Sequence, residues 1–135
     1  MTQVLLDTHA LWWLLGGEVG FGREAWRIIR GALSSDGLVV SAISFWEVAM
    51  LKEGRRLSLD ISVSAWRQRV LQLGIKEVAV SGDIGIAAAE LSGFHADPAD
   101  RILAATAVLG GATLLTADER ILTWNGELRR QDARS

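Results

Sequence analysis

Residues 112–118, Ala112-Thr113-Leu114-Leu115-Thr116-Ala117-Asp118, join a short apolar run to an acid. Val4-Leu5-Leu6-Asp7, near the start of the sequence, does the same. A run of three or four apolar residues is typical of a strand that is buried on both faces of a sheet. Two further runs, at 38–40 and 78–80, predict two more strands of this kind. The repeated pattern therefore predicts a sheet whose strands are followed by acidic residues.

Helical periodicity fills the intervals between these runs, and capping residues or glycines mark several helix ends. The predicted helices lie at 8–15, 23–33, 44–53, 63–73, 84–91, 98–109 and 118–122. Strands that alternate with helices form parallel sheets covered on both faces. We therefore expect one α/β domain over 1–135, with three layers and a central, mostly parallel sheet of four to five strands. The tail from about 127 is the least determined part, and 127–132 is a candidate edge strand.

Composition narrows the classes of protein that the chain can represent. Half of its 135 residues are hydrophobic and 22% are charged, so a disordered chain is excluded. There is no cysteine, which excludes a disulfide scaffold and a thiolate zinc site. No apolar run is long enough to cross a membrane, and we see no signal peptide, so we expect a cytoplasmic protein. The net charge of −2 argues against a protein that coats nucleic acid, but a nuclease remains open.

Four acids are placed where they can meet in the predicted fold. Asp7 and Asp118 follow strands, Glu47 lies one turn into the helix after the second strand, and Asp100 lies in the first turn of another helix. Each also has a simple structural interpretation: Asp7 and Asp118 as helix caps, Ser44 to Glu47 as a capping box, and Asp100 as an acid favoured by the helix dipole.

Geometry favours a shared site over four separate caps. The carboxyl ends of parallel strands and the starts of the following helices share one edge of a sheet, where ligands bind. Carboxylates that converge there repel one another unless they are protonated or bind cations. Oxygen ligands prefer hard cations, so Mg²⁺ is expected, with Mn²⁺ as a substitute. Such a site suits the hydrolysis of phosphodiesters by a metal-activated water.

Four segments carry a recognisable pattern that spans nearly the whole chain. They are Val4-Leu5-Leu6-Asp7-Thr8-His9-Ala10, Ser41-Ala42-Ile43-Ser44-Phe45-Trp46-Glu47, residues 95–107 from His95 to Ala107, and Leu114-Leu115-Thr116-Ala117-Asp118. In their order and spacing these segments resemble the PIN-domain family, and within it the VapC-like toxins of toxin–antitoxin pairs.

The resemblance implies a Mg²⁺-dependent endoribonuclease with a Rossmann-like sheet and a central acidic pocket. It implies that Asp7, Glu47, Asp100 and Asp118 are the catalytic and metal-binding acids, with the Thr116 hydroxyl close by. It also implies a homodimer and inhibition by a small cognate antitoxin. RNA would be the substrate.

Most of the residues next to these acids are expected to have structural roles. Asp97 directly precedes Pro98 and is interpreted first as a helix cap, with an auxiliary site role as the alternative. His95 is expected to pack in a loop, and His9 to make a structural hydrogen bond. Arg101 lies next to Asp100 in the sequence and is a candidate RNA contact.

Two further surfaces are predicted from the sequence. Arg23, Arg27 and Arg30 recur at helical spacing and are candidates to guide RNA toward the acids. The adjacent Trp12 and Trp13 point about 100° apart on a helix, so one of them is expected to contribute to an apolar partner surface.

Two other functions remain as alternatives. One is an RNA-processing nuclease with no toxin role. The other is a non-catalytic or Mg²⁺-binding regulatory α/β module, for example one that accepts a phosphoryl group. That chemistry needs a lysine near the acids, and neither Lys52 nor Lys76 follows a late strand as it requires.

Overall fold

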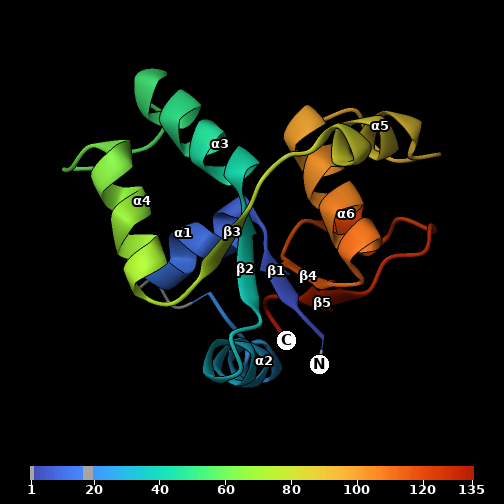
Figure 1. Cartoon of the computed structure of the whole chain (residues 1–135), viewed down its shortest axis with the longest axis horizontal. Coiled ribbons are helices and arrows are strands. Elements are labelled where there is room, and N and C mark those ends of the chain that lie inside the picture. The colour runs from blue at the N-terminus through green and yellow to red at the C-terminus, as the bar shows by residue number, and fades with distance from the viewer. Residues whose placement is uncertain (1, 17–19) are drawn as a thin grey trace.

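The computed structural model describes residues 2–16 and 20–135, and its five strands form one parallel sheet (Figure 1). The order across the sheet is β3-β2-β1-β4-β5. The strands are β1 (Val4–Leu6), β2 (Leu38–Ser41), β3 (Lys76–Val78), β4 (Thr113–Thr116) and β5 (Arg130–Asp132). The α/β class and the parallel sheet expected from the sequence are confirmed, and β5 is the edge strand expected within 127–132.

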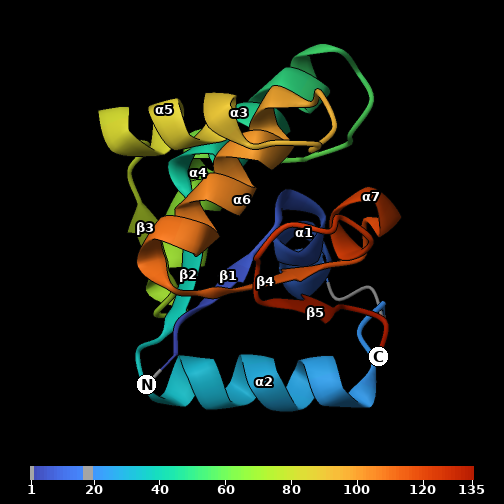
Figure 2. The ribbon, with the colours of Figure 1, turned by 90° about the vertical axis from the view of Figure 1, so that its right-hand side faces the viewer.

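Helices cover both faces of this sheet, so the molecule has three layers. The helices are α1 (Thr8–Gly16), α2 (Arg23–Ser34), α3 (Ala42–Glu53), α4 (Val63–Gln72), α5 (Gly82–Glu90), α6 (Pro98–Gly110) and α7 (Glu119–Leu122). Figure 1 shows α1, α3 and α4 on one side of the sheet and α5 and α6 on the other. Figure 2 shows α2 along the edge of the sheet where the strands begin.

Alternation of side chains along the strands builds a separate hydrophobic core on each face. Val4 and Leu6 of β1 pack with α1 and α2 on one face, and Leu5 between them packs against α6 on the other. All three are at most 5% exposed. Strands buried on both faces carry continuous apolar runs, which is why these strands are recognisable in the sequence.

The order of the strands places a switch point between β1 and β4. From β1 the chain moves outward through β2 to β3, then returns to place β4 on the opposite side of β1. The register pairs Leu6, the last residue of β1, with Leu115, so β4 extends one residue further and both strands end at the same edge of the sheet. Ligands of parallel sheets bind at such a crevice. Asp7 follows β1 there and Asp118 lies two residues beyond β4.

Among the predicted elements whose bounds differ from the observed ones, two have a clear physical cause. The third strand lies at 76–78 rather than 78–80, because this edge strand pairs with β2 through Lys76 and Glu77 and is only partly buried. The helix predicted from Ser44 begins at Ala42, since the Ser41 hydroxyl caps it by accepting a hydrogen bond from the Ile43 amide at 3.1 Å.

Within residues 2–16 and 20–135, no helix combines the length and the apolar character needed to cross a membrane.

Candidate metal centre

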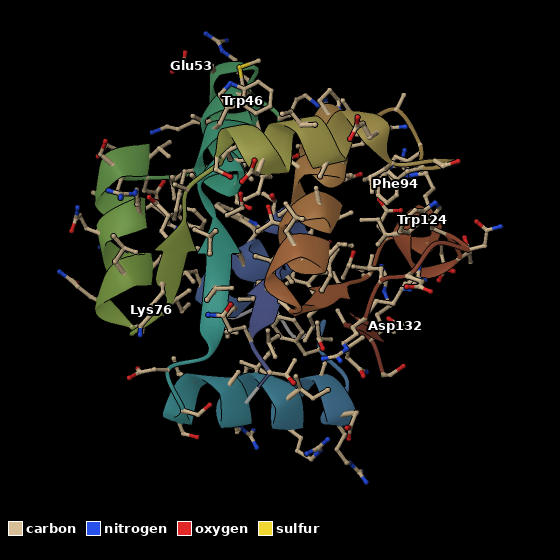
Figure 3. The ribbon with its side chains drawn as sticks, turned by 45° about the vertical axis from the view of Figure 1, so that its right-hand side comes forward. Trp46, Glu53, Lys76, Phe94, Trp124 and Asp132 are labelled. Atoms are coloured by element: carbon tan, nitrogen blue, oxygen red, sulfur yellow. The ribbon has the colours of Figure 1, made fainter. Side chains whose placement is uncertain are left out.

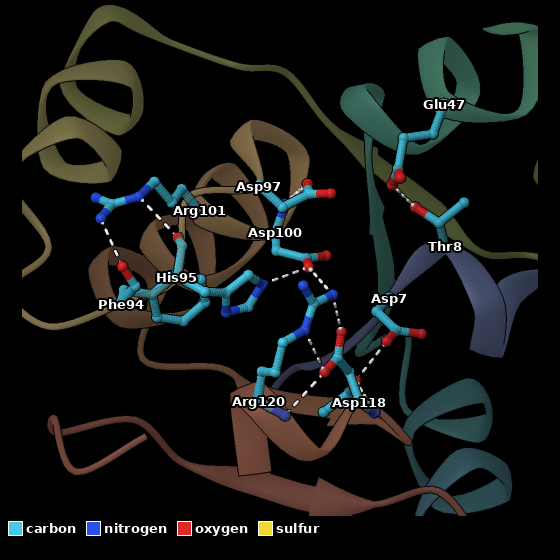
Figure 4. A network of polar contacts seen from close by, with 11 residues as sticks. Asp7, Thr8, Glu47, Phe94, His95, Asp97, Asp100, Arg101, Asp118 and Arg120 are labelled. Atoms are coloured by element: carbon cyan, nitrogen blue, oxygen red, sulfur yellow. Dashed lines mark hydrogen bonds and ion pairs between the residues drawn. The ribbon is translucent and has the colours of Figure 1, made fainter. Parts of the chain in front are cut away.

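The four predicted acids come from four separate segments and surround one space (Figure 4). Asp7 lies between β1 and α1, Glu47 in the second turn of α3, and Asp100 in the first turn of α6. Asp118 is the N-cap of α7. Figure 4 shows Asp7, Asp100 and Asp118 close together and Glu47 on the far side of the space, where it contacts Thr8. The fold thus brings together side chains as far apart in the sequence as Asp7 and Asp118.

Asp7 is held at the centre by hydrogen bonds to both of its oxygens. Its Oδ1 accepts from the Ala10 amide at 2.8 Å, which caps α1, and its Oδ2 accepts from the buried Thr116 hydroxyl. Thr116 Oγ1 in turn accepts from the Asp118 amide at 3.0 Å. Thr116 therefore links the two acids that flank the switch point, and Asp7 serves both as a cap and as a site carboxylate.

Glu47 is oriented by a different pair of hydroxyl groups. The Thr8 hydroxyl donates to Glu47 Oε1 and lies 2.9 Å from the hydroxyl of Ser44, which is fully buried. The predicted capping box is wrong, because α3 begins before Ser44 and places that residue inside the helix. Glu47 is thereby available to the site rather than folded back onto the start of its own helix.

Asp100 lies among three polar neighbours. Its Oδ2 is 2.7 Å from Nε2 of His95, and its amide donates to Asp97 Oδ1 at 3.0 Å. The interpretation of Asp97 as the cap of α6 is confirmed by that bond. One ligand atom each from His95, Asp100 and Asp118 lies within 4.8 Å of the other two, which is close enough for a shared ion. His95 stacks on Phe94 as a packing residue would, but it also faces the acids.

Arg120, two residues after Asp118, supplies the positive charge among these acids. Its Nη2 lies 2.9 Å from Asp118 Oδ2 and 3.6 Å from Asp100 Oδ2. Its Nε donates to Asp118 Oδ1 at 3.2 Å. The guanidinium therefore bridges two of the four predicted acids (Figure 4).

Burial and the charges of neighbouring groups shift the pKa values of the four acids. Burial raises the pKa of Asp7, Glu47 and Asp100, and the neighbouring carboxylates raise it further. For Asp118, partial burial alone would raise the pKa, but the hydrogen bonds and charge of Arg120 outweigh it and hold the pKa below its ordinary value. Ionising Asp7, Glu47 and Asp100 therefore costs free energy, and a bound cation would offset that cost.

The residues present fit a divalent cation. Carboxylate oxygens are the ligands of Mg²⁺ and Mn²⁺, and an imidazole nitrogen is compatible with Mn²⁺. The guanidinium of Arg120 already stands as a cation between Asp100 and Asp118. The site therefore attracts positive charge at the position where the fold brings the acids together.

Arg101 is used inside the chain. Its guanidinium donates to the carbonyl oxygens of Ala88, His95 and Phe94 at 2.9, 3.0 and 2.7 Å. These bonds fasten the segment that carries His95 to the start of α6 and the end of α5. Arg101 thus positions His95 and Asp100, and its predicted contact with RNA stays a prediction.

We expect Arg101→Met to lower the free energy of unfolding by about 2–4 kcal/mol, since it leaves several partly buried carbonyls without a donor. Urea unfolding measures the change. Arg23→Met is the matched control, because Arg23 is an exposed residue at the start of α2. Unchanged stability of Arg101→Met would show that these hydrogen bonds do not anchor the loop.

The arginines of α2 lie far from the acids. Arg27 pairs with Glu24, and the Arg30 guanidinium lies 5.4 Å from the centre of the Trp26 ring. Figure 2 places α2 at the edge where the strands begin, whereas the acids follow the strand ends. The structure does not bring Arg23, Arg27 and Arg30 to the acids, toward which they were predicted to guide RNA.

Both tryptophans of α1 pack on other aromatic rings but are only half-buried, and their predicted contribution to a partner surface stays a prediction. Trp12 packs on Trp66 and Trp13 on Phe21, with ring centres 5.7 and 5.6 Å apart. Leu11 is fully buried. Among the described residues, the large exposed apolar side chains include Trp46 of α3, which Figure 3 labels, and Met50 of α3 and Ile86 of α5.

Two hollows flank the acids. A cleft of about 220 Å³ is lined by Asp7, His9, Trp13, Ala117, Asp118 and Arg134. An open groove of about 640 Å³ lies on the other side, lined by Gly93, Phe94, His95, Arg120, Thr123, Trp124 and Asn125. His9 is exposed in the cleft, and no hydrogen bond of its side chain is found within residues 2–16 and 20–135, contrary to the predicted structural bond.

Sequence reasoning missed three polar partners of the acids: Thr8, His95 and Arg120. A usable signal existed for Arg120, because a basic residue two positions after a capping acid can fold back onto it. His95 precedes Asp100 by five residues, and only the loop held by Arg101 turns its ring toward the carboxylate.

Comparison with known proteins assigns the family. The chain belongs to the PIN-domain family, whose model matches residues 4–123. Among curated proteins it is 37% identical to Ribonuclease VapC22 of Mycobacterium tuberculosis over 122 residues, which is 90% of this chain and 91% of that protein. The resemblance drawn from the four sequence segments is thereby confirmed.

Solved structures share the fold. A VapBC complex from Salmonella typhimurium bound to DNA matches with a TM-score of 0.66 and 19% identity, over 98% of each chain. VapBC2 from Rickettsia felis, bound to a promoter DNA fragment, matches with a TM-score of 0.69 and 15% identity, over 96% of this chain and 98% of that one. At these identities the likeness establishes the architecture alone.

Proposed function

We propose that this protein is a Mg²⁺-dependent endoribonuclease, able to use Mn²⁺, and that it acts as the toxin of a toxin–antitoxin pair. The observation that carries the proposal is the meeting of Asp7, Asp100 and Asp118 at the switch point of the sheet, with Glu47 facing them. The similarity to a curated ribonuclease over nine-tenths of the chain supports RNA as the substrate.

The chain contributes ligands, orientation and charge to this reaction. Asp7, Asp100 and Asp118 would hold the cation, and Glu47 on the opposite side would orient a water or complete the ligand set. Bound Mg²⁺ supplies a lowered pKa for a water and stabilises charge on the phosphate. Thr116 and Thr8 fix the Asp7 and Glu47 carboxylates through hydrogen bonds, which keeps the acids in place before substrate binds.

Cleavage of single-stranded RNA by the purified protein tests the nuclease proposal. We expect products in Mg²⁺ or Mn²⁺ and none in EDTA, with activity restored when Mg²⁺ is added back. Internal cuts in a circular RNA would show endonucleolytic action. Cleavage that persists in EDTA would refute a metal-dependent mechanism. Metal-stimulated cleavage of DNA in preference to RNA would refute the assignment of the substrate.

The toxin role and the partners need separate tests. The structural neighbours are toxin–antitoxin complexes, which supports a small cognate antitoxin as the partner of this chain. We expect growth arrest when the protein is expressed in the cytoplasm, and relief when the small gene next to its own is co-expressed. Unimpaired growth during expression of the active nuclease would favour an RNA-processing enzyme. Sedimentation of the isolated protein at twice the chain mass would support the proposed homodimer.

A further inference from the structure

Arg120 lies within the acidic site, where its guanidinium pairs with the carboxylates of Asp100 and Asp118. Its guanidinium forms a two-point contact with Asp118, with Nε to Oδ1 at 3.2 Å and Nη2 to Oδ2 at 2.9 Å. The same Nη2 lies 3.6 Å from Asp100 Oδ2. Both carboxylates belong to the set that would bind the cation, so guanidinium and cation compete for the same oxygens.

The arginine is held there loosely. Its side chain is 61% exposed, whereas those of Asp100 and Asp118 are 16% and 25% exposed. Ion pairs with an exposed partner contribute little because water screens them. Within the described residues, the side-chain hydrogen bonds of Arg120 go only to Asp118. Arg120 can therefore leave the carboxylates without disturbing the packing of the fold.

The open groove beside the acids is where the Arg120 guanidinium can bind when it leaves the carboxylates. Arg120 lines this groove together with His95, Trp124 and Asn125, and the buried Phe94 packs against the rings of His95 and Trp124. Aromatic side chains next to an amide and a basic group are typical of sites for single-stranded nucleotides, which stack on rings while arginine contacts phosphate. A guanidinium matches the oxygens of a phosphate with two parallel hydrogen bonds.

We propose that Arg120 is an exchangeable counter-ion: it neutralises Asp100 and Asp118 in the metal-free protein, and when those acids bind a divalent cation it turns to bind an RNA phosphate beside the cleaved bond. Arg120 is thus a substrate-binding residue that stays paired with the metal ligands as long as no metal is bound. The inference rests on the proposed nuclease function and adds to it the residue that contacts the backbone of the RNA.

The first part of the test measures metal affinity, not activity. Calorimetric titration with Mn²⁺ alone is compared between wild type, Arg120→Gln and Arg134→Gln. We expect Arg120→Gln to bind Mn²⁺ about two- to fivefold more tightly, because no guanidinium has to be displaced. Arg134→Gln is the matched control: it removes the same charge from the neighbouring cleft, but its guanidinium bonds to the Ala117 carbonyl and not to the acids. Equal affinities for wild type and Arg120→Gln would overturn the exchange.

The second part measures the affinity for RNA in Ca²⁺, with a single-stranded oligonucleotide. We expect Arg120→Gln to weaken binding in Ca²⁺ and to lower the slope of log affinity against log salt by about one contact. In EDTA the variant should bind RNA as the wild type does, because Arg120 is then paired with the acids. Arg120→Lys should restore charge but only part of the affinity, since an ammonium lacks the two-point geometry. Unchanged RNA affinity of Arg120→Gln in Ca²⁺ would contradict a phosphate contact.

The two proposals fail in distinguishable ways. A wild-type protein that neither binds Mn²⁺ nor cleaves RNA refutes the nuclease function itself. A wild-type protein that does both, with an Arg120→Gln variant that matches it in both titrations, refutes only the exchange. Circular dichroism of each variant confirms that a changed affinity is not a loss of fold.

Discussion

Replacing Asp100 by asparagine is expected to reduce RNA cleavage in Mg²⁺ by about 10³-fold. A bound metal contributes several kcal/mol of charge stabilisation in the transition state, and each 1.4 kcal/mol is about tenfold in rate. An amide keeps the size of the side chain and its bond to His95 but supplies no negative charge. Initial rates on an RNA oligonucleotide across a range of Mg²⁺ concentrations measure the loss.

The control for this variant is Asp83→Asn. Asp83 also lies in the first turn of a helix, α5, but it is exposed and outside the cluster around Asp100. We expect Asp83→Asn to cleave at the wild-type rate. If Asp100→Asn retained more than about a tenth of the activity at saturating Mg²⁺, a role for Asp100 as a metal ligand would be untenable.

Replacing Asp7 by asparagine is expected to stabilise the metal-free protein while abolishing cleavage. Asp7 is 5% exposed, and burial raises its pKa, so at neutral pH its charge opposes folding. An asparagine retains the acceptor for the Ala10 amide and can donate to Thr116. In a domain of this size, about 1 kcal/mol shifts the melting temperature by roughly 2–8 °C, so we expect a rise of that order in EDTA.

The dependence on pH follows from the direction of the pKa shift. A raised pKa in the folded state means that the stability contributed by protonated Asp7 is present below its unfolded pKa and is lost as the pH rises through the folded pKa. The advantage of Asp7→Asn should therefore be large at pH 7 and vanish near pH 4. Thermal melts at both values, with the exposed Asp60→Asn as control, measure it. A lower melting temperature for Asp7→Asn at pH 7 would mean that the carboxylate acts chiefly as a helix cap.

The sheet and the acids were predictable because local patterns determine them. Strands β1, β2 and β4 are buried on both faces, so each is an uninterrupted apolar run, and Asp7 and Asp118 follow the runs at the switch point. Edge strand β3 was displaced in the prediction because Lys76 and Glu77 face water on one side and carry no apolar signal. Local sequence patterns thus locate the strands that are buried on both faces, and they misplace an edge strand whose side chains are partly exposed.

The polar partners of the acids were not predictable because they depend on tertiary placement. His95 reaches Asp100 only through a loop that Arg101 holds by its carbonyl oxygens. The capping box at Ser44 failed for a similar reason: Ser41 competes for the same role, and the structure favours the serine that ends β2. The distant position of the α2 arginines likewise follows from the path of the chain around the sheet, not from their spacing.

Anomalous diffraction from a crystal soaked in Mn²⁺ tests the central claim most directly. If the acids form one metal centre, a manganese peak will lie within coordination distance of Asp100 and Asp118 carboxylate oxygens, beside Asp7, and the Arg120 guanidinium will have moved off those oxygens. A crystal that takes up manganese elsewhere, or shows Arg120 still bridging Asp100 and Asp118 at saturating Mn²⁺, would contradict the account.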